Sequence, residues 1–195
     1  MIYLVRHGET EFNRERRWQG IKDSPLTELG VRQARAMAGL LADLTVRDPG
    51  PWRIVASPLG RTRQTAAIVS ERLGLPIAFD ERLREHSIGE FDGERADDVV
   101  PQLRQDLPRH ERHFHVPGGE TYEALCQRIG GFLAEVRRED RLIIVSHGAA
   151  GRVFRGLYGG LGKEEMLTLP VPQDAVYRLM NGQVDRFDCE PLDEA

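Results

Sequence analysis

Residues 142–145, Leu-Ile-Ile-Val, restrict the fold of this chain more than any other segment. The four residues are apolar without interruption and three are β-branched, so they predict a strand that is buried on both faces. Strands of this kind belong to mostly parallel sheets that helices cover on both sides. Residues 2–5, Ile-Tyr-Leu-Val, predict a second buried strand at the start of the chain.

Segments with helical spacing of apolar residues alternate with these strands. One helix is predicted to begin after Thr27, its expected N-cap, and to end before Pro49. Another is predicted to have Ser57 as N-cap and Pro58 in the first helical position, and to run towards Gly74. Further strands are predicted at residues 54–56 and 77–79, and a further helix at about residues 122–137.

The last part of the chain predicts an antiparallel pair of strands. Asn181-Gly182 lies between two β-rich segments, residues 176–180 and 184–187, and is typical of a two-residue hairpin turn. Together with the alternating strands and helices, the pair predicts an α/β fold of three layers, α/β/α, with a mostly parallel mixed sheet. The length of 195 residues suits one domain, so residues 1–195 are expected to form a single unit.

The composition argues against several classes of function. A formal net charge of −4 does not favour nucleic-acid binding, and no apolar run approaches the length of a membrane span. The two cysteines, Cys126 and Cys189, lie far apart and form no CxxC pair, which fits a reducing cytoplasm. A charged residue already at position 6 does not fit a secretory signal.

Three predicted strands end in residues that can hold a phosphate. These are Arg6-His7-Gly8 after the first strand, Ser57 and Arg61 after the second, and Ser146-His147-Gly148 after the most apolar one. In an open α/β sheet, ligands bind beyond the carboxyl ends of the strands, where loops and helix N-termini meet. The sequence therefore predicts that these groups share one pocket.

The residue types in this pocket suit phosphoryl transfer. The guanidinium groups of Arg6 and Arg61 offer planar forks of donors that match phosphoryl oxygens and keep their charge at any working pH. Such fixed charges stabilise the transition state, but a nucleophile is also needed. Neutral imidazole is a competent nucleophile, and both His7 and His147 are candidates that position alone does not rank.

Five motifs occur here in the order that they have in the histidine phosphatase superfamily, which the chain resembles over nearly its whole length. They are Leu4-Val5-Arg6-His7-Gly8-Glu9-Thr10, Ser57-Pro58-Leu59-Gly60-Arg61-Thr62-Arg63-Gln64-Thr65-Ala66, Leu83-Arg84-Glu85 followed by Gly89 and Gly93, Pro117-Gly118-Gly119-Glu120-Thr121, and Val145-Ser146-His147-Gly148. The resemblance implies a phosphoglycerate mutase-like fold and chemistry without a metal or an organic cofactor.

The resemblance also implies roles for single residues. His7 would be the phosphorylated nucleophile, and Glu85 would protonate the leaving group and then act as base for water. The other members of the phosphate pocket would be Arg6, Arg61 and His147. The residues expected to contact substrate are Asn13, at a phosphoryl oxygen, and Gln19, Gly20 and Gly148.

Several of these assignments have rivals. Glu9 and Asp92 are alternative acids, although an acid beside the phosphate arginines has a lowered pKa, which favours the wrong protonation state. Trp18 either stacks on the substrate or packs locally. Many family members have an Asn before the last strands, where this chain has Pro172-Gln173-Asp174-Ala175, and the match is weaker there.

Residues of about 95–118 are expected to form a cap. This segment carries the three histidines His110, His113 and His115 among the arginines Arg104, Arg109 and Arg112. It is interpreted as a solvated loop, as a mobile cap whose positive groups select anionic substrates, or as a metal site. A cap without a metal is the interpretation adopted.

The sequence thus predicts a cytoplasmic phosphatase that hydrolyses small phosphorylated metabolites through a phosphohistidine on His7. The alternatives are a phosphotransferase of the phosphoglycerate mutase type and a non-catalytic module that binds a phosphate ligand. Cofactor-dependent mutases of the family carry extra segments that close over the bisphosphate, and this chain has no obvious room for them. A homodimer formed through an exposed strand edge is a further expectation.

Overall fold

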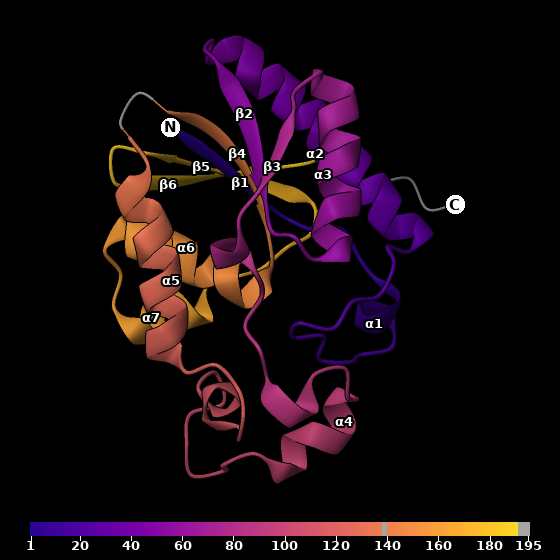
Figure 1. Ribbon diagram of the computed structural model, residues 1–195, viewed down its shortest axis with the longest axis vertical. Coiled ribbons are helices and arrows are strands. Elements are labelled where there is room, and N and C mark those ends of the chain that lie inside the picture. The colour runs from indigo at the N-terminus through magenta and orange to yellow at the C-terminus, as the bar shows by residue number, and fades with distance from the viewer. Residues whose placement is uncertain (138–139, 191–195) are drawn as a thin grey trace.

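The structure is a computed structural model that describes residues 1–137 and 140–190. A six-stranded sheet in the order β3-β2-β4-β1-β5-β6 forms its centre (Figure 1). The strands are β1 (Ile2–Arg6), β2 (Trp52–Ala56), β3 (Ile77–Phe79), β4 (Arg141–Ser146), β5 (Ala175–Met180) and β6 (Gln183–Asp188). The first four strands pair in parallel, whereas β5 pairs antiparallel with both β1 and β6. The predicted mostly parallel mixed sheet is confirmed.

Helices cover both faces of this sheet. On one face lie α2 (Glu28–Arg47) and α3 (Gly60–Leu73), and on the other lie α5 (Tyr122–Glu135), α6 (Gly148–Gly159) and α7 (Lys163–Thr168) (Figure 1). The three predicted layers are therefore present.

Alternate residues of β1 and β4 enter different cores. The core under α2 and α3 contains Tyr3, Val5, Ile143 and Val145, and the core under α5, α6 and α7 contains Ile2, Leu4, Leu142 and Ile144. All eight side chains are at most 3% exposed. Burial of a large aliphatic side chain stabilises a fold by roughly 1.5–3 kcal/mol. The register of these two central strands is therefore fixed. The residues that directly follow β1 and β4 are held in place as a result.

Shorter elements lie beyond the carboxyl ends of the strands, in the lower half of Figure 1. They are α1 (Glu11–Arg14), η1 (Glu81–Leu83), η2 (Gly89–Phe91), α4 (Ala96–Val99), η3 (Val100–Gln102) and η4 (Arg112–His115). A small third core lies around η2 and α4 and consists of Ile88, Val99, Leu103 and Val116, with Trp18 and Phe91 against it. The segment predicted as a cap contains α4, η3 and η4.

Most predicted element boundaries agree with the structure, but the start of α3 does not. Thr27 accepts a hydrogen bond from the backbone N–H of Gly30 and caps α2, as predicted. Ser57 does not cap α3, which begins at Gly60 after Leu59. The carboxylate of Asp23 accepts hydrogen bonds from the N–H groups of Gly60 at 2.5 Å and of Arg61 at 3.3 Å. This distant side chain supplies the acceptor that a helix start requires.

Other differences concern the end of one predicted helix and three helices that the sequence did not predict. The α5 helix ends at Glu135, two residues before the predicted end. The helices α1, α6 and α7 were not predicted at all. The predicted hairpin is confirmed, because Asn181 and Gly182 have φ values of 52° and 78°, as its two-residue turn requires.

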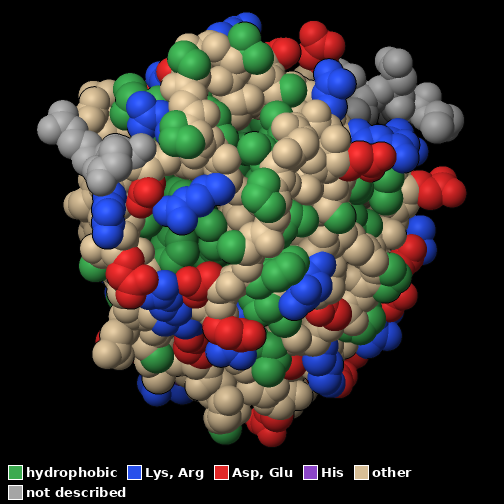
Figure 2. All heavy atoms as spheres, turned by 45° about the horizontal axis from the view of Figure 1, so that its top comes forward, with side chains coloured by type: hydrophobic (Ala, Val, Ile, Leu, Met, Phe, Trp, Pro, Cys, Tyr) green, Lys and Arg blue, Asp and Glu red, His purple; other side chains and the backbone are tan. Residues whose placement is uncertain are grey.

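The surface in Figure 2 carries basic and acidic side chains in close alternation, so neither sign of charge dominates that face. Within residues 1–137 and 140–190, no helix combines the length and the apolar character needed to cross a bilayer.

Candidate active site

His7 follows β1 directly and is buried. Its Nδ1 lies 2.8 Å from the carbonyl oxygen of Gly8, which can only accept a hydrogen bond, so Nδ1 carries the ring hydrogen. The lone pair of His7 is therefore on Nε2, where it accepts a hydrogen bond from the Nε–H of Arg61 at 3.3 Å. Burial and the charges of Arg61 and Arg6 hold the pKa of His7 well below its usual range, which keeps the ring neutral.

His147 follows β4, the neighbour of β1, and its ring centroid lies 5.3 Å from that of His7. Its Nε2 lies 2.7 Å from the hydroxyl oxygen of Ser57, which follows β2. Its Nδ1 is buried and has no hydrogen-bond partner within the described part of the chain. The three strand ends thus meet as predicted, and Ser57 holds one imidazole in place.

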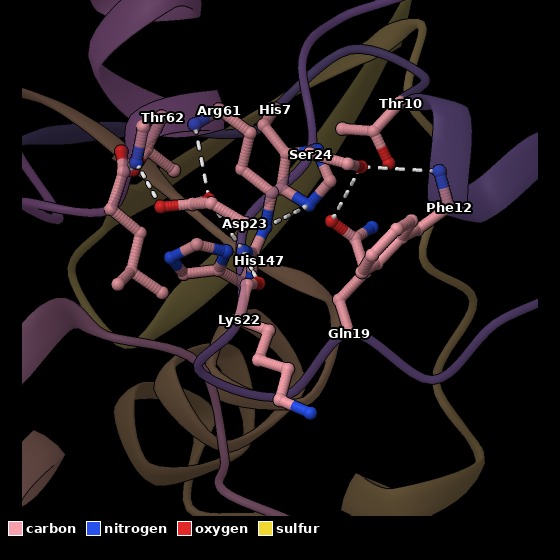
Figure 3. Close-up of polar contacts among 12 residues, drawn as sticks. His7, Thr10, Phe12, Gln19, Lys22, Asp23, Ser24, Arg61, Thr62 and His147 are labelled. Atoms are coloured by element: carbon pink, nitrogen blue, oxygen red, sulfur yellow. Dashed lines mark hydrogen bonds and ion pairs between the residues drawn. The ribbon is translucent and has the colours of Figure 1, made fainter. Parts of the chain in front are cut away.

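Arg61 lies in the first turn of α3 and is 1% exposed. Its Nη1 donates to the carbonyl of Lys22 and to the carboxylate of Asp23, both at 2.8 Å (Figure 3). Its Nη2 donates to the carbonyl of Gly20 at 2.8 Å. With the bond from Nε to His7, four of the five N–H groups of a guanidinium are used. One N–H on Nη2 remains for a ligand.

Arg6 is the last residue of β1, and it lines the same site as His7 and Arg61. Its Nη1 donates to the carbonyl of Val171 at 2.6 Å, and its buried Nε has no partner among the residues that the structure describes. Burial lowers the pKa of Arg6 to about 10, with Arg61 acting in the same direction and Glu85 against it. The group therefore keeps its positive charge at neutral pH.

The side chain of Glu85 lies against the N-terminus of α6, although Glu85 is not part of that helix. Its two carboxylate oxygens accept hydrogen bonds from the backbone N–H groups of Gly148, Ala149 and Ala150 at 2.9–3.1 Å and of His86 at 2.9 Å. Burial acts to raise its pKa, but the N–H groups of Ala150 and His86 and the charge of Arg61 outweigh burial and lower it. Glu85 is thus a carboxylate at neutral pH in the ligand-free protein.

A cavity of about 270 Å³ opens between these groups. Arg6, His7, Arg61 and Glu85 line it, together with the predicted Asn13, Gln19 and Gly20. His147 and Gly148, also predicted at the site, are not among the residues that line this cavity, although the N–H of Gly148 is bound by Glu85. A larger cavity of about 420 Å³ lies at the other end of β1, beside Met1 and Ile2, and none of the predicted site residues lines it.

The family model of the histidine phosphatase superfamily (branch 1) matches residues 2–190. The chain belongs to this superfamily. Relatives from Salmonella paratyphi C and Yersinia pestis, both named probable phosphoglycerate mutase GpmB, are 36% identical over 195 and 196 residues, which cover 97% of this chain and 85% of each relative.

Solved structures agree with this membership. A mycobacterial glucosyl-3-phosphoglycerate phosphatase in complex with VO3 is 25% identical, has a TM-score of 0.77, and is matched over 97% of this chain and 99% of that one. A structure from Thermus thermophilus is 31% identical, with a TM-score of 0.68 and coverage of 90% and 91%. The chain is therefore an enzyme of the histidine phosphatase superfamily.

Gln173 is a site residue that sequence reasoning missed. Its Nε2 donates to the carbonyl of His7 at 3.2 Å and to Oδ1 of Asn13 at 3.0 Å. Oδ1 of Asn13 also accepts from the backbone N–H of Thr10 at 3.2 Å. Because the carbonyl of His7 can only accept and the N–H of Thr10 can only donate, both side-chain amides have a fixed orientation. The NH₂ group of Asn13 is thereby left for the cavity, where a histidine phosphatase would bind phosphate.

Gln173 stands in the segment where the match to the family pattern is weakest. Many superfamily members have an Asn there, and the Gln of this chain also provides an amide. The sequence therefore did contain an indication of this role, because Gln173 keeps the side-chain amide of the Asn on a longer side chain. Its contact with Asn13 spans 160 residues of chain and is not visible in the pattern alone.

We expect Gln173→Glu to weaken phosphate binding more than Gln173→Met does. A carboxylate cannot donate to Oδ1 of Asn13 or to the carbonyl of His7, and it would place a negative charge beside the group that binds the phosphate anion. The inhibition constant for inorganic phosphate should rise about tenfold, the equivalent of one hydrogen bond to a charged group. Phosphate inhibition of the three proteins at equal thermal stability is the measurement, and equal inhibition constants would contradict the role.

The predicted cap contributes a histidine to the cavity and no arginine. His113 lines the wall beside His86 and Trp18, which places Trp18 at the site instead of only in local packing. Arg104 pairs with Asp106, and Arg112 donates to the carbonyl of Leu107 at 2.9 Å. The idea that positive cap groups line the site is therefore wrong for these two arginines.

The remaining alternatives also have structural outcomes. Within the described residues, no three His, Cys, Asp or Glu side chains come together as a metal site requires, so His110, His113 and His115 do not form one. Glu9 accepts from the hydroxyl of Thr27 at 2.8 Å, and Asp92 accepts from the N–H of Ile88 at 2.8 Å. Neither of these rival acids lines the cavity.

The glycine that follows His7 is required by the packing of the protein itself. A Cβ at Gly8 would lie 2.1 Å from the carbonyl oxygen of Gly30, so Gly8 is required by the packing of α2 against the loop. A Cβ at Gly148 would meet its nearest atom, a carboxylate oxygen of Glu85, at 3.5 Å.

Proposed function

We propose that this enzyme hydrolyses small phosphomonoesters through a phosphohistidine on His7, without a metal. The main support is the arrangement of three nitrogens at the strand ends. Nε2 of His7 carries no hydrogen, so its lone pair can attack phosphorus. Near it lie two buried nitrogens, Nδ1 of His147 and Nε of Arg6, that have no hydrogen-bond partner within the described residues. Buried polar nitrogens without partners are rare in proteins, and a phosphoryl group would satisfy both.

Attack by Nε2 of His7 would form a P–N bond while the P–O bond to the leaving alcohol breaks. The imidazole then gains a positive charge, which the carbonyl of Gly8 stabilises through the hydrogen on Nδ1. The hydroxyl of Ser57 can donate to Nε2 of His147, which leaves a hydrogen on Nδ1 of His147 for a phosphoryl oxygen.

Arg61 is well placed to respond to this step. In the free enzyme its Nε–H binds the lone pair of His7, and that lone pair disappears when the P–N bond forms. The Nε–H and the remaining N–H on Nη2 then become available together. Two parallel N–H groups match the oxygens of a phosphoryl group, so Arg61 would bind the transferred group through both. The positive charge that stabilises the transfer would come from Arg61 and Arg6 together.

Glu85 is the proposed acid for the leaving alcohol and the proposed base for water. Its lowered pKa in the free enzyme suits a base better than an acid. A phosphate dianion placed beside it would repel its charge and raise its pKa again. The alcohol would leave with a proton from Glu85. Water would later give a proton to Glu85 and its hydroxyl to phosphorus while the P–N bond to His7 breaks.

The proton requirement leads to a prediction about pH. A substrate complex needs one proton, held either by Glu85 or by the phosphate, whose second pKa is about 6. His7 and Glu85 both have pKa values below their usual ranges, so neither limits activity between pH 6 and 8. For an alkyl phosphomonoester we expect kcat/KM to fall about tenfold for each pH unit above about 6. A pH profile that stays flat to pH 8 would contradict this shared proton.

Hydrolysis of p-nitrophenyl phosphate in the presence of EDTA tests the proposed function. Release of phosphate at an undiminished rate would support it, and no release would contradict it. A phosphoglycerate mutase activity is the second candidate, because the relatives at 36% identity bear that name. Conversion of 3-phosphoglycerate in the presence of a bisphosphate primer, without net phosphate release, would favour the mutase.

The proposed setting is the cytoplasm, because both cysteines are free. Cys126 and Cys189 are half-buried, and burial raises the pKa of each thiol, so neither is activated as a nucleophile.

A further inference from the structure

We propose that the outer half of the active-site cavity selects phosphomonoesters whose alcohol carries an uncharged aromatic ring. This inference rests on the proposed phosphatase function and concerns only the group to which the phosphate is attached. The outer wall consists of Arg17, Trp18, His86, Ile88 and His113, which come from three segments of the chain.

Flat rings make up most of this wall. The ring of His113 lies 5.2 Å from that of His86 and 6.4 Å from that of Trp18, measured between centroids. The ring of Phe114 lies 4.1 Å from His113 and 4.5 Å from His86, and it supports both from behind. Aromatic groups pack at such distances in offset and edge-to-face arrangements, so a ring on the substrate would find complementary partners.

The wall is also held in place before a ligand arrives. The backbone of Trp18 donates to the carbonyl of Glu94 at 2.9 Å and accepts from Gly93 at 2.5 Å. Nε2 of His86 lies 2.8 Å from the carbonyl of Glu120, which fixes the hydrogen on that nitrogen. A preformed surface binds a rigid ring without a further cost in side-chain ordering.

The imidazoles of this wall carry no charge at neutral pH. Burial lowers the pKa of His113 to about 3, and the neighbouring His86 acts in the same direction. Burial also lowers the pKa of His86. The ring of His86 already donates its hydrogen to Glu120, and neither ring supplies the positive charge that a carboxylate would need when it leaves water.

Arg17 is the one cation on the outer wall within the described residues, and it already has an anionic partner. Its Nε donates to the carboxylate of Glu15 at 2.6 Å, and its Nη1 donates to the carbonyl of Gly93 at 3.1 Å. A substrate carboxylate would have to compete with Glu15. The carboxylate of a phosphorylated hydroxy acid therefore finds no free cation among the described residues of this wall. An uncharged ring can pack against the aromatic side chains instead.

Three alkyl phosphates with similar leaving groups test this selectivity. Benzyl phosphate carries an uncharged ring, glycerol 3-phosphate is small and uncharged in its alcohol, and 3-phosphoglycerate adds a carboxylate. We expect kcat/KM of the wild type to be at least about tenfold higher for benzyl phosphate than for 3-phosphoglycerate, with glycerol 3-phosphate between them. Equal or higher values for 3-phosphoglycerate would overturn the inference.

Variants of the wall locate the selectivity. The ratio of kcat/KM for benzyl phosphate to that for 3-phosphoglycerate should fall about three- to tenfold in Trp18→Ala. It should fall further in His113→Lys, which adds a charge, and stay near the wild-type value in His113→Phe, the matched control that keeps an uncharged ring. Because each ratio is taken within one protein, partial unfolding cancels.

These outcomes separate this inference from the proposed function. An unchanged ratio in both Trp18→Ala and His113→Lys would reject the aromatic wall while leaving the phosphatase intact. If the wild type hydrolysed none of the three esters, the proposed function itself would fail.

Discussion

Replacement of His7 by alanine is expected to lower kcat for p-nitrophenyl phosphate by about 10⁴-fold or more, because the reaction loses its nucleophile. The substitution removes Nε2, the atom that accepts the Nε–H of Arg61 in the free enzyme. Both arginines remain and can still bind phosphate, so the inhibition constant for inorganic phosphate should change far less than kcat does. Steady-state kinetics and phosphate inhibition of the same preparation are the measurements.

His147→Ala is the matched comparison, because the two imidazoles lie side by side and position in the sequence does not rank them. His147 would supply one hydrogen bond to the phosphoryl group, and loss of one such donor costs about 10²- to 10³-fold in kcat. We therefore expect His7→Ala to be the more severe variant. If His147→Ala abolished activity while His7→Ala retained more than about one part in a hundred, the assignment of the nucleophile would be reversed.

Glu85→Gln is expected to slow poor leaving groups far more than good ones. For glycerol 3-phosphate, kcat/KM should fall about 10²- to 10⁴-fold, the usual contribution of a general acid. For p-nitrophenyl phosphate the fall should be less than about tenfold, since the departing oxygen needs little help. The value of kcat/KM is the proper readout, because it ends with departure of the leaving group and does not include the later attack of water.

The comparison of two substrates within this variant is needed because Glu85 also supports the fold. Its carboxylate accepts three N–H groups at the start of α6, and a Gln amide cannot accept all of them. Loss of a helix-capping acceptor costs about 1 kcal/mol of stability. Such a loss would lower the amount of folded enzyme equally for both substrates. Equal slowing of the two esters would therefore point to a structural role and against the acid.

The apolar strands and the residues after them were predictable because local patterns determine both. Four continuous apolar residues at 142–145 required burial on two faces, and the structure divides them between two cores. Once β1 and β4 are neighbours, the rule that ligands bind at carboxyl ends places His7 beside His147. The ring separation of 5.3 Å follows from register, which the sequence pattern reflects only indirectly.

Two of the failures have a common physical cause, which is that carboxylates distant in the sequence cap the helices α3 and α6. The start of α3 depends on Asp23, 37 residues away, so Ser57 next to the helix was mistaken for its cap. The α6 helix begins after His147 without a capping side chain of its own and contains four glycines, so it was not predicted. Its N-terminus is bound by Glu85, 63 residues away.

The same long-range contacts build the site. Asp23 holds Arg61, Glu85 joins α6 to the cavity, and Gln173 orients Asn13. The residues proposed to recognise the phosphate were therefore predictable by type and position, whereas the residues that orient them were not. Gln173 belongs to this second group.

The most direct test of the account is a search for the phosphorylated residue. Rapid acid-free quenching during turnover of p-nitrophenyl phosphate, followed by peptide mass spectrometry, should find one phosphoryl group on the peptide with His7. Glu85→Gln should accumulate more of it, since attack of water is then slowed. A burst of p-nitrophenol equal to one equivalent of enzyme should accompany the modification. Turnover without phosphate on His7, or with phosphate on His147 instead, would contradict the central claim.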